Sequence, residues 1–212
     1  TNALGKSILI CAVLSVLLLC SRIIYTGHIT YIFLLWNLFL AVLPLMISLL
    51  IINENLKSKL WIFVWLLLLP NAPYIITDFF HLKQSIYISK WYDVLLLMCF
   101  SWTGLICGLV SLYITHLYFN KIFSKKTAKR FIYVSILLCA YGIYLGRFLR
   151  WNSWDVLMNP LELINSCFYS FFIFIKEPSY LSFVLVFAIF MAVAYNTIYS
   201  IFEKPLNAIG NE

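Results

Sequence analysis

The chain has 212 residues, of which 64% are hydrophobic and only 11% are charged. Soluble domains are typically about 25% charged, so this chain lacks the side chains that would cover a surface facing water. Its composition argues against a soluble enzyme, a disordered segment or a nucleic-acid-binding protein. It predicts an all-α fold, a polytopic bundle of helices surrounded by membrane lipids.

Six stretches are apolar over the roughly 17–25 residues that a helix needs to cross a bilayer. In chain order they are 7–25, 31–52, 59–81, 94–119, 131–149 and 180–202, and they are expected to make residues 1–212 a single integral-membrane domain. A shorter stretch, 161–175, lies between Pro160 and Pro178 and carries most of its apolar residues on one helical face. We expect it to be a helix lying in the membrane interface, with a short or re-entrant span as the alternative.

The chain carries 15 Lys and Arg residues against 8 Asp and Glu residues, a net charge of +7. Basic residues collect in the loops on the cytoplasmic side of membrane proteins. The loop 120–130 contains no acidic residue and holds Lys121, Lys125, Lys126, Lys129 and Arg130. With six spans, this loop and both termini are expected to face the cytoplasm. The basic excess is therefore attributed to topology, and no nucleic-acid partner is expected.

Seven of the other ionisable residues collect at one depth, the outer edge of the predicted bundle. A helix rises about 1.5 Å per residue, and this rise brings residues from separate spans to that edge. They are Arg22, Asp78, His81, Asp93, Arg147 and Arg150, with Asp155 beyond the fifth span and Asn37 about two turns below the edge. Ionisable groups at membrane depth are costly and usually face the bundle interior. We therefore expect one polar cavity that opens to the outer face.

The third span contains two prolines, Pro70 and Pro73, in the stretch PNAPYIITDFFH. Each proline removes a backbone donor, so carbonyls about one turn earlier lose their partners and the helix is expected to kink or break. Asn71 is expected to cap the restarted helix. Beyond the break, Tyr74, Thr77, Asp78 and His81 are expected on one face. Breaks of this kind line substrate sites in transporters, and they also occur as simple packing kinks.

Asp78 and His81 are three residues apart, so their side chains can touch. A carboxylate that orients an imidazole makes a general base, and these two are therefore the candidate catalytic residues. With Asp93 or Asp155 the same pair could instead ligate a metal, but the sequence has no specific metal motif, and we assign no metal site and no cofactor. The structural alternative is a histidine that is held in a salt bridge or faces the membrane interface.

Arg147 and Arg150 share a helical face, and their guanidinium groups suit a phosphate or a carboxylate. The candidate substrate-binding residues are Arg22, Asn37, Asn71, Tyr74, Asp93, Arg147, Arg150, Trp151 and Asp155. The alternative is that the two arginines pair with the nearby aspartates and serve the structure alone.

Two pairs of glycines have the four-residue spacing that allows helices to pack closely, Gly104 with Gly108 and Gly142 with Gly146. They lie on consecutive predicted spans but at different depths. We therefore expect them to serve packing without expecting the two pairs to meet.

Four segments together resemble the bacterial family called "domain of unknown function thirteen sixty-one". These are WNLFLA at 36–41, PNAPYIITDFFHL at 70–82, WYD at 91–93 and GRFLRWNSWD at 146–155. The resemblance covers roughly residues 22 to 199. It implies a small polytopic protein of the bacterial cytoplasmic membrane, and it brings no established reaction, cofactor or partner.

Three functions fit this pattern. The first is an envelope protein that binds or processes an anionic lipid or a lipid-linked substrate at the outer leaflet. The second is a transporter that uses the broken third span, and the third is a non-catalytic scaffold or assembly subunit. A closed network of paired charges would favour the scaffold, whereas an open pocket with an unpaired histidine or arginine would favour a binding site or an enzyme.

Overall fold

The computed structural model describes residues 2–53, 59–82 and 88–209, without the side chains of residues 2 and 203–209. Within these ranges the chain is helical and contains no strand, which confirms the all-α prediction. The helices are α1 (Asn2–Thr26), α2 (Phe33–Ile52), α3 (Lys59–Leu68), α4 (Asn71–Tyr74), the 3-10 helix η1 (Ile75–His81), α5 (Lys90–Ile122), α6 (Lys125–Phe148), α7 (Asp155–Met158), α8 (Pro160–Lys176) and α9 (Pro178–Ile209).

Six segments are long and apolar enough to cross a membrane, and they correspond to the six predicted spans. The chain is accordingly a multi-pass membrane protein. The helices extend beyond the predicted spans at both ends of α5 and at the start of α6. Polar residues extend these helices, and the Ser124 hydroxyl accepts a hydrogen bond from Thr127 N at 3.3 Å, so α6 begins at Lys125 within the expected loop.

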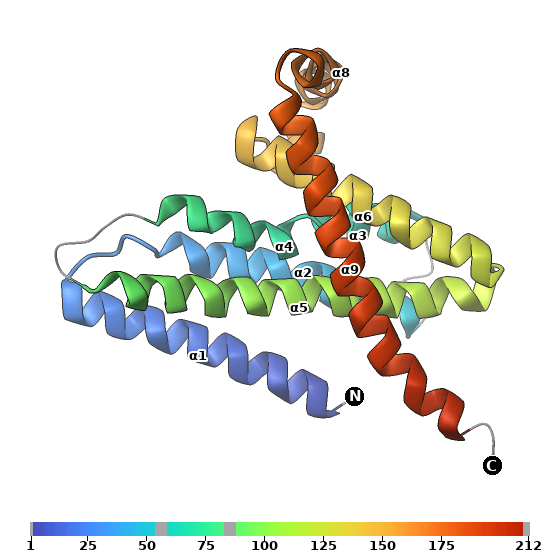
Figure 1. Cartoon of the computed structure of the whole chain (residues 1–212), viewed down its shortest axis with the longest axis horizontal. Coiled ribbons are helices and arrows are strands. Elements are labelled where there is room, and N and C mark those ends of the chain that lie inside the picture. The colour runs from blue at the N-terminus through green and yellow to red at the C-terminus, as the bar shows by residue number, and fades with distance from the viewer. Residues whose placement is uncertain (1, 54–58, 83–87, 210–212) are drawn as a thin grey trace.

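α5 is the centre of the bundle. It contacts α1, α2, α4, η1, α6 and α9, and Figure 1 shows it running the length of the molecule with α1, α2 and α4 beside it. In its apolar segment 67% of the residues are buried, against 17% in α1 and in α9. Figure 1 also shows that α1 at its N-terminal end and α9 at its C-terminal end point toward the end of the bundle where α5 ends.

α8 differs in direction from the spans. In Figure 1 it is seen almost end-on while α5 lies across the view, so its axis is roughly perpendicular to that of α5. It begins at Pro160, as a proline favours, and is not among the six membrane-crossing segments. The apolar face predicted for it is uncovered, with Leu161 76%, Phe168 66% and Ile175 78% exposed. Its placement in the membrane interface stays a prediction.

The third span is broken where the two prolines predict. α3 ends at Leu68, α4 begins at Asn71, and the chain then tightens into η1 rather than continuing as an α-helix. Asn71 is not the N-cap of the restarted segment, because Pro70 occupies that position with helical angles of φ −57° and ψ −30°. The chain therefore stays helical through the break, and the Asn71 side chain points back toward α3.

Both glycine pairs pack against this broken span, one from each side. A Cβ at Gly104 would lie 2.5 Å from the carbonyl oxygen of Ala72, and one at Gly108 would lie 3.1 Å from the Ala72 Cβ. On the other side, a Cβ at Gly142 would lie 2.6 Å from Pro70 Cγ, and one at Gly146 would lie 3.1 Å from the Tyr74 ring. The short α4 is thus clamped between α5 and α6, and the two glycine pairs do not meet each other.

Candidate functional site

Arg147, in the last turn of α6, binds the polar face of η1. Its Nε donates to Thr77 Oγ1 at 2.8 Å, and its Nη2 donates to Asp78 Oδ1 at 2.5 Å. Its Nη1 lies 2.9 Å from His81 Nε2. Because a guanidinium has only donors, a hydrogen bond between these two groups requires Nε2 of His81 as the acceptor. We call the set Thr77, Asp78, His81 and Arg147 the Arg147 network.

Asp78 is the buried anion of this network, with its side chain 1% exposed. Its second oxygen, Oδ2, accepts from Asn37 Nδ2 of α2 at 2.8 Å. Among the described residues no hydrogen bond joins Asp78 to His81, and each contacts a different nitrogen of Arg147. In a 3-10 helix, side chains three residues apart eclipse one another, so both can face the same guanidinium. The expected direct contact of Asp78 with His81 is therefore replaced by a bridge through Arg147.

Arg22 and Asp93 form a second, separate ion pair. Arg22 Nε donates to Asp93 Oδ1 at 2.6 Å and Nη2 donates to Oδ2 at 3.2 Å, with side chains only 4% and 1% exposed. The guanidinium carbon lies 4.6 Å from the centre of the Tyr31 ring. In place of the single polar cavity expected from the sequence there are two separate ion pairs, and Arg22 Nη1 is buried without a hydrogen-bond partner among the described residues. For Arg147 the structure matches the alternative in which the arginine pairs with a nearby aspartate. Arg22, which that alternative did not include, pairs with Asp93, whereas Arg150 has no such pair among the described residues.

Arg150 and Asp155 stand apart from both pairs. Arg150 lies beyond the end of α6 with φ 60°, so it no longer shares the helical face of Arg147. Its side chain is exposed and has no ion-pair partner in the described part of the chain. Asp155 Oδ2 accepts from Asn152 N at 2.7 Å and starts α7. Neither Asp155 nor Asp93 joins Asp78 and His81, and no three potential metal ligands gather among the described residues.

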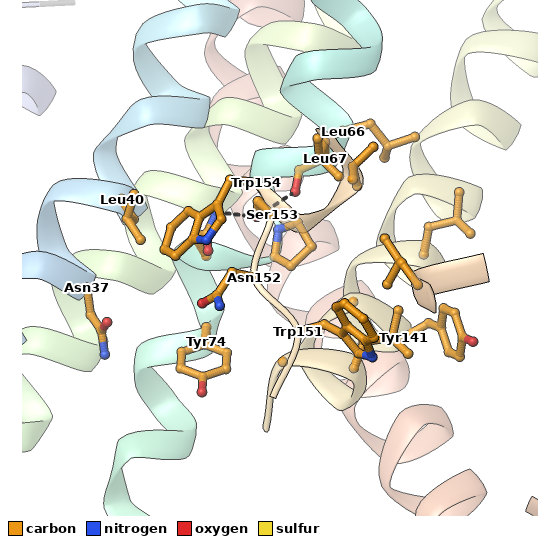
Figure 2. Close-up of a pocket in the computed structure, with 18 of the residues that line it drawn as sticks. Asn37, Leu40, Leu66, Leu67, Tyr74, Tyr141, Trp151, Asn152, Ser153 and Trp154 are labelled. Carbon is orange, nitrogen blue, oxygen red and sulfur yellow. Dashed lines mark hydrogen bonds between the residues drawn. The ribbon is translucent and has the colours of Figure 1, made fainter. Parts of the chain in front are cut away.

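A pocket of about 330 Å³ lies at the break of the third span (Figure 2). Its walls come from α2, α3, α4, α6, the segment 151–154, α7 and α8. Four of the predicted binding residues line it: Asn37, Asn71, Tyr74 and Trp151. Two of these connect it to the Arg147 network, since Asn37 binds Asp78 and the Tyr74 ring lies 4.6 Å from the Arg147 guanidinium.

Sequence reasoning did not identify the segment 151–154 as a wall of a pocket. Figure 2 shows this segment crossing beside the break, with Trp154 beside Leu40 of α2. Ser153 Oγ donates to the Leu67 carbonyl at 3.2 Å, and it accepts from Asn71 Nδ2 at 3.1 Å. Asn71 Nδ2 also donates to the Leu68 carbonyl at 3.0 Å. Ser153 and Asn71 thus satisfy carbonyls at the end of α3, as an apolar surrounding demands.

The pocket is lined in part by exposed residues of the membrane spans. Three of its lining residues on membrane spans are largely exposed on the outside of the bundle, Trp36 at 53%, Phe63 at 54% and Leu138 at 45%. None of its described lining residues is charged, and its polar groups are amides, hydroxyls and indole nitrogens. A site of this kind suits an uncharged, amphipathic part of a ligand that approaches from the lipid.

Replacing Asn71 with alanine is expected to lower the free energy of unfolding by about 0.6–2 kcal/mol, the range for hydrogen bonds inside membrane bundles. The change leaves the Leu68 carbonyl without this side-chain donor and removes the bond to Ser153. Unfolding of the purified protein in mixed micelles by added SDS measures the loss. Asn165→Ala, on the exposed surface of α8, is the matched control and is expected to change stability by less than about 0.5 kcal/mol. Equal losses in the two variants would contradict the role of Asn71.

Comparison with protein-family models gives one family, described as protein of unknown function (DUF1361), whose model matches residues 36–194. No match was found among curated proteins or among solved structures. The matched range includes the whole pocket and the Arg147 network, and it confirms the family that the sequence resembles. Because the match covers well over half of the 212 residues, the chain belongs to this family of proteins of unknown function.

Proposed function

We propose that this protein binds an amphipathic lipid or a lipid-linked molecule in the pocket at the break of the third span. The observation that carries the proposal is that three pocket-lining residues on membrane-spanning helices, Trp36, Phe63 and Leu138, are largely exposed. A ligand dissolved in the bilayer can enter there without crossing water. The orientation belongs to the same proposal: the Arg147 network faces the outside of a bacterial plasma membrane, and both termini face the cytoplasm.

The size of the pocket restricts which part of a lipid it holds. About 330 Å³ is near the lower end of the range for ligand sites, so it suits one segment of a lipid rather than a whole molecule. The apolar walls from α3 and α6 suit the start of an acyl or isoprenoid chain. The amide of Asn152, in the segment 151–154, and the Tyr74 ring both line the pocket (Figure 2) and suit the polar junction of such a chain.

Arg150 supplies the charge for an anionic headgroup in this proposal. It is exposed, lies next to the pocket-lining Trp151, and has no ion-pair partner among the described residues. Its left-handed backbone costs about 1–2 kcal/mol for a residue with a side chain, and strain of this kind clusters at functional sites. Arg147 does not take this role, because Thr77, Asp78 and His81 already engage its three nitrogens.

The proposal predicts that a tryptophan at position 138 prevents lipid binding by filling the pocket. Leu138 and Leu137 are neighbours on α6 with similar exposure, 45% and 46%, but only Leu138 lines the pocket. Each variant is extracted in polymer nanodiscs, delipidated in detergent and examined by native mass spectrometry with added anionic phospholipid. Leu138→Trp is expected to lose most of the bound lipid, whereas Leu137→Trp retains it.

Arg150→Gln tests the headgroup in the same experiment. An exposed ion pair is worth a modest amount, so this variant is expected to bind anionic lipid about two- to fivefold more weakly and zwitterionic lipid unchanged. Equal binding by the Leu138→Trp and Leu137→Trp variants would refute the pocket as the lipid site. A loss confined to Arg150→Gln would place the lipid at the surface instead.

A further inference from the structure

Three asparagines line the pocket at the break of the third span, Asn37, Asn71 and Asn152. In each of them the amide NH₂ group donates to an oxygen that accepts. The acceptors are Asp78 Oδ2 at 2.8 Å, the Leu68 carbonyl at 3.0 Å and Asp155 Oδ2 at 3.4 Å, respectively. Because these partners fix which end of each amide is the donor, the carbonyl oxygen Oδ1 is the end that remains in all three.

These three carbonyl oxygens have no hydrogen-bond partner among the described residues, and none of them is among the buried unpartnered atoms. The same holds for the hydroxyl of Tyr74, which also lines the pocket. An amide carbonyl only accepts hydrogen bonds, so its partner must carry a donor. Esters and phosphodiesters offer only acceptors, whereas hydroxyl groups donate. The pocket therefore favours a ligand that bears several hydroxyl groups.

Three tryptophans line the same pocket, Trp36, Trp151 and Trp154. Trp36 of α2 and Trp154 pack edge to face, with ring centres 6.4 Å apart and ring planes at 62°. Both remain open to a ligand, with 53% and 42% of their surface exposed. The face of an indole is electron-rich and attracts groups that are slightly positive, such as the C–H groups on the face of a sugar ring. Tryptophans beside free acceptors therefore suit a sugar, which has hydroxyl groups at its edge and C–H groups on its faces.

We propose that the lipid-linked ligand of this pocket carries a sugar ring. The hydroxyl groups of the sugar donate to the asparagine carbonyls, and its C–H face lies against the tryptophans. This inference rests on the proposed function, since the lipid part of the molecule brings the sugar to the pocket. About 330 Å³ limits the pocket to one ring and the start of the chain. A simple sugar is uncharged, as are all the described lining residues, and an anionic group of the same ligand lies outside the pocket at Arg150.

The experiment uses the full chain in a polyoxyethylene detergent, because glucoside and maltoside detergents themselves carry a sugar. Native mass spectrometry compares the binding of two added lipids that have the same acyl chains, monoglucosyl dioleoylglycerol and dioleoylglycerol. Both lipids are uncharged, so Arg150 does not contribute to the difference between them. The glucosyl lipid is expected to bind at least about tenfold more tightly, which is the gain from two or more hydrogen bonds.

Two variants test the two kinds of contact. Asn152→Leu removes one acceptor while keeping the size of the side chain, and it is expected to weaken binding of the glucosyl lipid about two- to tenfold. Trp154→Leu is expected to weaken it about fivefold, whereas Trp154→Phe, which keeps an aromatic face, retains most of it. The matched controls, Asn165→Leu and Trp91→Leu, change exposed residues outside the pocket and are expected to leave binding unchanged. Trp91 packs edge to face on Tyr92, so its replacement also tests whether tryptophans act here only as membrane anchors.

The outcomes separate the sugar from the lipid site. Equal binding of the two lipids, no binding of either, or equal losses in the Trp154→Leu and Trp91→Leu variants would overturn the sugar. The lipid site would then still stand if Leu138→Trp, and not Leu137→Trp, loses the anionic phospholipid. Release of the glucosyl lipid by millimolar methyl glucoside would identify a soluble sugar and overturn the lipid-linked form of the proposal.

Discussion

Replacing Arg147 with alanine is expected to lower the free energy of unfolding by about 3–5 kcal/mol, because Asp78, 1% exposed, would remain as an uncompensated buried charge. This is the largest effect of a single substitution that the site predicts. The loss is measured by SDS-induced unfolding and by the melting temperature in detergent. Arg150→Ala is the matched control, since this arginine is exposed and unpaired within the described residues, and its effect is expected to stay within about 0.5 kcal/mol.

A double variant separates the loss of charge balance from the loss of packing. Arg147→Met keeps an unbranched side chain beside the Tyr74 ring, and Asp78→Asn removes the charge that Arg147 neutralises. The two changes together are expected to be less harmful than Arg147→Ala alone, since an isolated buried charge costs more than a missing pair. A double variant that is no more stable than Arg147→Ala would show that the ion pair is not the source of the effect.

Gly104→Ala is expected to lower the free energy of unfolding by about 1–3 kcal/mol, the usual cost of placing an extra carbon in a packed interior. The added Cβ would lie 2.5 Å from the Ala72 carbonyl oxygen, which belongs to the backbone and cannot rotate away as a side chain would. α4 must therefore separate from α5. The same unfolding assay measures the loss.

Gly5→Ala is the control for this substitution, because no atom lies within 4 Å of the position where its Cβ would be. Alanine is the better helix former, so this variant is expected to be unchanged or slightly more stable. Gly142→Ala, on the opposite side of the clamp, is expected to resemble Gly104→Ala, since its Cβ would lie 2.6 Å from Pro70 Cγ. A stable Gly104→Ala variant would mean that the close approach is not required.

The number and type of the spans could be predicted because lipid leaves the chain few choices. A backbone in hydrocarbon must satisfy its own hydrogen bonds, so long apolar stretches become helices whatever their detailed sequence. The first and last residues of the helices were less predictable, because the length of an apolar stretch does not show how far the helix continues beyond the bilayer. The start of α6 could have been predicted, because serine is a typical N-cap residue and the Ser124 hydroxyl accepts a hydrogen bond from Thr127 N.

The depth of the charged residues in the bundle could be predicted from the sequence, but the pairs that they form could not. Depth counting brought Arg22, Asp78, Asp93 and Arg147 to one end of the bundle, yet which arginine meets which aspartate depends on the order of the helices around α5. The sequence carries no measure of that order. Ser153 was missed for a different reason: a small residue outside the helices has no periodic pattern, and its role depends on the carbonyl of Leu67, which is distant in sequence.

The clamped glycine faces also determine where this protein can change shape. A proline pair in a membrane helix is a natural hinge, but here the broken segment has α5 against one side and α6 against the other. Bending at Pro70 or Pro73 would press Ala72 into α5 or Pro70 into α6, and close-packed interfaces of this kind move as blocks rather than flex. The third span, α5 and α6 therefore form one stiff body. Any opening motion at the pocket is therefore expected from the walls outside this body, which are the segment 151–154, α7 and α8, since α2 packs against α5.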